Sequence, residues 1–214
     1  MGRITKDFNR ARTPTKDGSI NRRADRGFDL VMDLFAEAMG ERCIGTERRL
    51  LHKKLFLQNF HYLKKLDLSY TLENRFWERS YNLEIYSELE TNDLFQEEGE
   101  CLFEVDAKGR FRVHSVTWKY MQGTLNSEQA QRYVDRLNHP LILERICALD
   151  LSHIQVEHRS GSGKWRIQFH SMLGSTTWVL IPPILQTIKP KPAEFIKMVE
   201  FLDLTADAVI NNRL

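Results

Sequence analysis

The chain has 214 residues and a mass of 25.2 kDa, the size of one large domain or of one domain with an appended arm. Its three cysteines exclude a disulfide framework and suit a reducing compartment. No apolar run reaches the roughly 18 residues that span a bilayer. We therefore expect a cytoplasmic protein without membrane contact.

The formal charge of +2 is unevenly distributed. Residues 1–26 hold eight Lys and Arg against three Asp, a net +5, whereas residues 27–214 carry a net −3. Residues 1–24 also contain few large apolar side chains, and they include the turn signals Thr13-Pro14-Thr15 and Asp17-Gly18-Ser19. Such a segment cannot bury enough apolar area to offset its ordering entropy, so the sequence predicts a flexible basic arm.

Apolar spacing predicts helices after the arm. A first helix is expected over about 25–39, with Asp25 as N-cap, because apolar side chains recur there at three- and four-residue steps. The stripe formed by Leu51, Leu55, Tyr62 and Leu66 predicts a second helix from Thr46 to about Leu66, with much of its remaining surface basic. The pattern of 67–79 is ambiguous and is compatible with a short helix. Residues 25–79 are thus expected to form a helical segment that packs on the main domain.

The apolar period changes near residue 80. Alternating side chains predict strands over 80–90, 100–105, 110–121, 152–158, 164–172 and 176–181. Helices are expected after the capping box of Asn126 and Gln129, over 141–149 with Pro140 in the first turn, and over about 192–211. The order strand-strand-strand-helix therefore occurs twice within 80–214. This is an α+β fold, in which two such units form one antiparallel sheet packed by helices.

The two predicted hairpins resemble each other in sequence. Gly109-Arg110-Phe111-Arg112-Val113 matches Gly163-Lys164-Trp165-Arg166-Ile167 at an offset of 54 residues. Duplication of one unit and convergence of two hairpins both explain this match, because hairpins favour these residue types. The order of elements resembles that of type III secretion chaperone-like adaptors and of duplicated sheets of the TATA-binding-protein kind. The resemblance concerns the fold and implies no particular function.

Basic side chains share one face of the predicted strands. In the strand 164–172, Lys164, Arg166 and His170 alternate with apolar residues, and Arg110, Arg112 and His114 do so in the strand 110–121. Together with the arm and the predicted basic helix, they form a candidate surface for nucleic acid or an acidic partner. Its residues are Arg10, Arg12, Arg22, Arg23, Arg48, Arg49, Lys53, Lys54, Arg110, Arg112, Lys164 and Arg166.

Other interpretations remain open. The net −3 of the body and the lack of known nucleic-acid signatures favour an ordinary solvated surface. An acidic stretch at 88–100 is a solvated loop, a docking surface or a partner for the basic arm. No sequence motif assigns a catalytic residue, a metal site or a cofactor.

The leading hypothesis is a non-enzymatic intracellular adaptor or binding protein, associated with nucleic acid through its basic arm and basic strand faces. One alternative is an enzyme whose pocket combines His114 or His170 with a carboxylate such as Glu104 or Glu157. Another is a chaperone-like adaptor that binds protein at the sheet without contacting nucleic acid.

Overall fold

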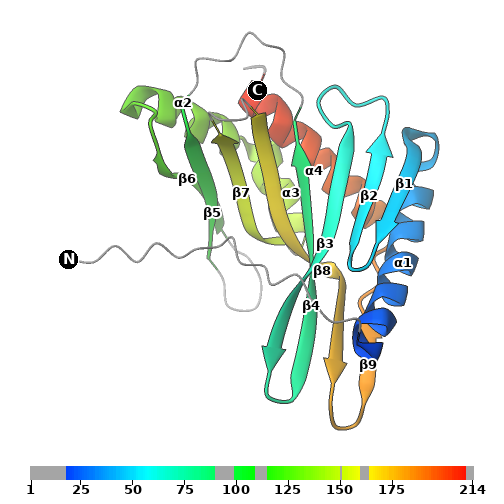
Figure 1. Cartoon of the computed structure of the whole chain (residues 1–214). Helices are drawn as coiled ribbons and strands as arrows, with labels where there is room; N and C mark the ends of the chain where they lie inside the picture. The colour runs from blue at the N-terminus through cyan, green and yellow to red at the C-terminus, as the bar shows by residue number, and fades with distance from the viewer. Residues whose placement is uncertain (1–17, 90–98, 109–114, 150, 160–163, 211–214) are drawn as a thin grey trace.

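The computed structural model describes residues 18–89, 99–108, 115–149, 151–159 and 164–210. Within them, nine strands form one antiparallel sheet, and four α-helices pack against one of its faces (Figure 1). This confirms the α+β class and the helix-covered antiparallel sheet expected from the sequence.

The helices are α1 (Ser19–Met39), α2 (Ser127–Leu137), α3 (Pro140–Ala148) and α4 (Pro192–Ile210), with a 3₁₀ turn η1 (Gly40–Arg42) after α1. The strands are β1 (Cys43–Arg49), β2 (His52–Leu57), β3 (Lys65–Arg75), β4 (Glu78–Glu88), β5 (Cys101–Lys108), β6 (Ser115–Gly123), β7 (Leu151–Arg159), β8 (Lys164–Val179) and β9 (Ile184–Thr187).

The strand order is β1-β2-β3-β4-β8-β7-β5-β6, and β9 pairs with the second half of β8. Strand β8 is the centre of the sheet, since it pairs with β4 along most of its length and with β7 in its first half. The two hairpins that resemble each other in sequence, β5–β6 and β7–β8, therefore lie side by side through the pairing of β5 with β7.

The core lies between the sheet and the helices. Alternate residues of the central strands, such as Leu83 and Ile85 of β4, are fully buried beneath the helices. Aromatic contacts join the layers: Phe169 of β8 packs edge-on against Phe201 of α4, and Trp165 lies 5.3 Å, centroid to centroid, from Tyr133 of α2. The apolar face of the sheet is thus fully used by the fold.

The helix predicted over 46–66 is wrong, since these residues form β1, β2 and the start of β3. In β2, Lys53, Leu55 and Leu57 are buried while their neighbours are more exposed, which is the alternation of a strand. The buried charge of Lys53 hid this alternation in the sequence. Residues 67–75 are likewise strand β3, so the segment 25–79 is helical only in its first part.

Three further boundaries differ from the prediction. Helix α1 begins at Ser19, with Gly18 as N-cap, so Asp25 lies inside the helix and its carboxylate pairs with Lys53. Residues 19–24 therefore belong to a helix, and residues 1–17 of the predicted arm lie outside the described part of the chain. The predicted strand 176–181 is the second half of β8, and β9 follows it. Residues 106–108, which lie between two strands predicted from the sequence, belong to β5, which extends to Lys108.

Several local predictions are confirmed. Asn126 and Gln129 form a reciprocal capping box at the start of α2, with the Gln129 backbone N–H donating to Asn126 Oδ1 at 2.9 Å. Pro140 occupies the first turn of α3, and α4 begins at Pro192. These signals are local, so they do not depend on the order of the strands.

Candidate functional site: the open face of the sheet

The face of the sheet opposite the helices carries a continuous row of polar side chains. The register aligns one residue from each of eight strands, because opposed residues of antiparallel strands point to the same face. From β1 to β6 this row is Glu47, Lys54, Asp67, Tyr86, Gln168, Gln155, Glu104 and Lys119.

Two flanking rows complete this surface. The first contains Arg49, His52, Ser69, Glu84, His170 and Ser152, and the second contains Phe56, Lys65, Glu88, Arg166, Glu157 and Leu102. Asp106, Arg159 and Lys164 continue the same alternation at the strand ends. We call the surface formed by these residues the open face.

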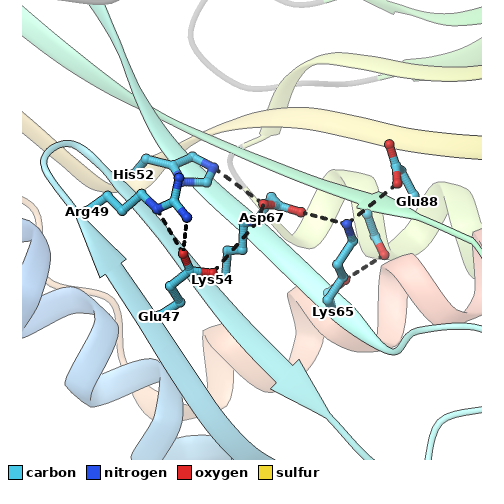
Figure 2. Close-up of polar contacts among 8 residues, drawn as sticks. Glu47, Arg49, His52, Lys54, Lys65, Asp67 and Glu88 are labelled. Atoms are coloured by element: carbon cyan, nitrogen blue, oxygen red, sulfur yellow. Dashed lines mark hydrogen bonds and ion pairs between the residues drawn. The ribbon is translucent and has the colours of Figure 1, made fainter.

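Ion pairs connect the cations of the open face to its carboxylates. The carboxylate of Asp67 is the clearest centre: its side chain is only 2% exposed, and the nitrogens of Lys54 and Lys65 each lie 3.7 Å from it (Figure 2). His52 Nε2 lies 3.3 Å from the same carboxylate, but burial lowers the pKa of His52, so this contact is not an ion pair at pH 7. Glu47 accepts a hydrogen bond from Arg49 Nε at 2.8 Å, and Lys65 also lies 3.5 Å from Glu88 (Figure 2).

The pairing continues on the far side of β4. Lys164 lies 4.0 Å from Glu88, Lys119 lies 2.6 Å from Asp106, and Glu157 serves both Arg159 at 2.8 Å and Arg166 at 3.8 Å. Seven cations of the open face are thus within 4.0 Å of a carboxylate, and its residues include seven Asp and Glu. The open face therefore has little net positive charge to offer a phosphate backbone.

The centre of the open face is partly removed from water. The Arg166 guanidinium stacks over the Tyr86 ring at 4.2 Å from its centroid. Burial, together with the neighbouring Asp67 carboxylate, raises the pKa of Tyr86 to about 12. Burial also raises the pKa of Glu84, against the opposing effect of Arg166.

His170 lies next to these groups. Burial lowers the pKa of His170 to about 4, assisted by His153, whose ring centroid lies 5.0 Å away. His170 is therefore neutral at pH 7, and the 3.9 Å separation between its Nε2 and Glu84 Oε2 does not represent an ion pair at that pH. A polar ligand can exchange hydrogen bonds with the neutral imidazole of His170, with the carboxamides of Gln155 and Gln168 and with the Tyr86 hydroxyl.

The structure separates the residues of the predicted basic surface. Arg49, Lys54, Lys164 and Arg166 share the open face, but each has a carboxylate neighbour. Alternation predicted this for Lys164 and Arg166 of β8, whereas Arg49 and Lys54 had been expected on a helix. Arg22 and Arg23 lie on the exposed side of α1. Arg10, Arg12, Arg110 and Arg112 lie outside the described residues.

Arg48 and Lys53 face the helices instead. Arg48 pairs with Asp29 and Asp33 of α1. Lys53 is 1% exposed, and its Nζ lies 2.9 Å from Asp25 Oδ1 and 2.8 Å from Asp29 Oδ1. Lys53 is therefore inaccessible to a partner, and it holds α1 to the sheet.

The carboxylates near His170 also differ from those expected. Glu104 accepts a hydrogen bond from Gln155 Nε2 at 2.7 Å, and Glu157 pairs with two arginines. The carboxylate beside His170 is instead that of Glu84, at 3.9 Å. His114 lies outside the described residues. Sequence alternation alone could have placed Glu84 on the wet face of its strand, but only the pairing of β4 with β8 brings it to His170.

Other kinds of site find less support. Within the described ranges, no three His, Cys, Asp or Glu side chains gather in a way that could hold a metal ion. In the same part of the chain, no helix is long and apolar enough to cross a membrane. A small cavity of about 120 Å³ is lined by Leu125 and by four residues of α2: Gln129, Arg132, Tyr133 and Arg136.

The fold and the open face define an α+β protein in which helices cover one face of the sheet, and no described helix covers the opposite, charge-paired face. Residues 35–209 match the model of a family described as "Protein of unknown function (DUF3156)", and the chain belongs to that family. Comparisons with curated proteins and with solved structures found no match.

Proposed function

We propose that this chain is a non-enzymatic binding protein of the adaptor type, which binds another protein on the open face of its sheet. The observation that carries the proposal is the partly dehydrated polar centre formed by Glu84, Tyr86, Arg166 and His170 on a face that no described helix covers. Removing ionisable groups from water is costly, and such groups concentrate at functional sites.

The charge pairing favours protein over nucleic acid as the partner. A phosphate backbone binds where cations release counterions, whereas these cations already neutralise carboxylates. A protein surface can match a mosaic of both signs, with carboxamides such as Gln155 and Gln168 adding hydrogen bonds at the centre. Salt bridges within the open face would also keep the long side chains ordered before the partner arrives.

Affinity capture with a matched pair of variants tests this proposal. Gln168→Arg adds an uncompensated charge at the centre of the open face, and Gln131→Arg makes the same change on the exposed surface of α2. Tagged wild type and Gln131→Arg should retain a defined protein after nuclease treatment, and Gln168→Arg should lose it. Equal retention by both variants would contradict the proposal.

Nucleic acid remains the second candidate because Arg22 and Arg23 lie on the exposed side of α1, directly after the basic residues 1–17. A chain lacking residues 1–17 leaves α1 complete and separates this possibility from the open face. If nucleic acid is the partner, binding should weaken steeply with salt and fall on this deletion, and material captured by the wild type should be sensitive to nuclease.

A further inference from the structure

The tips of two neighbouring hairpins form an exposed apolar cluster at one end of the molecule. The β3–β4 hairpin carries Phe76 and Trp77, and the β8–β9 hairpin carries Leu180, Ile181 and Ile184. These five side chains are 41–82% exposed. We call them the apolar tips.

The two hairpins lie side by side. Glu78 of β4 pairs with Val179 of β8, and the Leu180 N–H donates to the Trp77 carbonyl at 3.0 Å. Figure 1 shows both hairpins projecting in the same direction, beyond the helices that cover the rest of the sheet. The Phe76 and Trp77 rings pack edge to face with centroids 4.4 Å apart, so the aromatic pair is preformed.

We propose that the apolar tips insert into the surface of an anionic lipid bilayer. Trp and Phe at a projecting tip suit the boundary between lipid headgroups and acyl chains, where one side of the ring is apolar and the other is hydrated. The segment 180–188 carries no charged residue, so the β8–β9 tip can enter this boundary without dehydrating an ion.

Charge at the same end matches an anionic surface. The first turns of α1 lie beside β9, since a side chain at Gly27 would meet Thr187, and they carry Arg22, Arg23 and Arg26 on exposed positions. Basic side chains next to an inserted apolar element strengthen binding to acidic lipids.

The size of the cluster favours a bilayer over a second copy of the chain. Five side chains expose roughly a few hundred Å² of apolar area, whereas a stable dimer buries about 800 Å² on each partner. The sequence-based expectation of no membrane contact rested on the lack of a spanning segment, which insertion of tips does not require.

Vesicle flotation at about 50 mM salt tests the proposal, with vesicles of phosphatidylcholine alone or containing about 30% phosphatidylserine. The variant Phe76→Ser/Trp77→Ser removes the aromatic tip. The control Ile44→Ser/Met121→Ser removes two apolar side chains of similar exposure, 61% and 54%, from β1 and β6. Circular dichroism establishes that each variant is folded.

Wild type and control should float with phosphatidylserine vesicles, and the tip variant should lose at least about tenfold in bound fraction. Brominated lipids should quench tryptophan emission in the wild type. This quenching should be weaker in Trp77→Phe, which keeps the half-buried Trp178, while flotation persists. Absence of wild-type flotation, or equal flotation of the tip variant, would overturn the proposal. The proposal would also be overturned if vesicles were not bound and light scattering detected a dimer that the tip variant abolishes.

Discussion

Lys53 offers a direct test of how the sheet is held to α1. Its ammonium group is buried between the carboxylates of Asp25 and Asp29, and it also lies 5.5 Å from the centroid of the Phe28 ring. Asp25 Oδ1 additionally accepts a hydrogen bond from the Leu51 N–H at 2.8 Å. Lys53→Met keeps most of the apolar stem but removes the counter-charge of Asp25 and leaves Asp29 with only Arg48, at 3.6 Å.

The expected cost follows from this geometry. Removing one partner of a fully buried ion pair costs about 3–5 kcal/mol. The carboxylates here are 19% and 34% exposed, so water compensates part of the loss. We expect Lys53→Met to lower the free energy of unfolding by about 2–3 kcal/mol. The triple variant Lys53→Met/Asp25→Asn/Asp29→Asn should recover about half of this loss, because it leaves no unpaired charge.

Urea unfolding at pH 7, followed by circular dichroism, measures these values. The matched control is Lys54→Met, one residue along the same strand but on the open face. Lys54 is 26% exposed, and its partners Asp67 and Glu47 keep Lys65 and Arg49 as counter-charges, so we expect a loss of less than about 1 kcal/mol. The reasoning would be refuted if Lys53→Met unfolded within about 0.5 kcal/mol of the wild type, or if the two variants were equally destabilised.

Three further predictions, which use four substitutions, test other parts of the structure. His170 has a lowered pKa, so the unfolded chain binds its proton more readily, and stability should fall by about 2–3 kcal/mol as pH drops from about 6.5 to about 4. In urea titrations across that pH range, His170→Gln should lack this loss of stability. If its stability depended on pH as steeply as that of the wild type, the loss could not be assigned to His170. Gly174 has a φ of 88°, and a Cβ there would lie 2.6 Å from Leu83 Cδ2, so Gly174→Ala should cost about 2–4 kcal/mol in thermal or urea unfolding. A neutral effect would show that the backbone relaxes. Lys164→Glu should change stability by less than about 0.5 kcal/mol, whereas Arg166→Glu should cost about 2 kcal/mol because it removes the stacking on Tyr86 and faces Glu157. Equal unfolding midpoints for these two charge reversals would be inconsistent with a half-buried Arg166.

Local sequence signals predicted much of the second half of the fold. The alternation from Tyr81 to Leu89 and the capping box at Asn126 each depend on a few neighbouring residues, and both are found in the structure. The first half was harder because the apolar residues of β2 and β3 also fit helical spacing. In β2, the charged residue Lys53 occupies a buried position. The sequence of β2 therefore lacks a clear alternation of polar and apolar residues.

The open face could be predicted only in part. Alternation correctly placed Lys164, Arg166 and His170 on one side of β8. Their neighbours depend on long-range pairing: Glu84 comes from β4 and Glu157 from β7, and nothing local in the sequence indicates that β8 lies between them. The sequence alone therefore indicated basic side chains without neighbouring carboxylates. In the structure, the strand register brings carboxylates of neighbouring strands next to them.

The central claim is that the open face binds a protein, and site-specific photo-crosslinking in living cells tests it most directly. A photo-reactive amino acid is placed at Gln168, at the centre of the open face, and in a second chain at Gln131 on α2. The account predicts a discrete, protease-sensitive and nuclease-resistant adduct from position 168 and none of that size from position 131. Nuclease-sensitive adducts, or the same adduct from both positions, would contradict it.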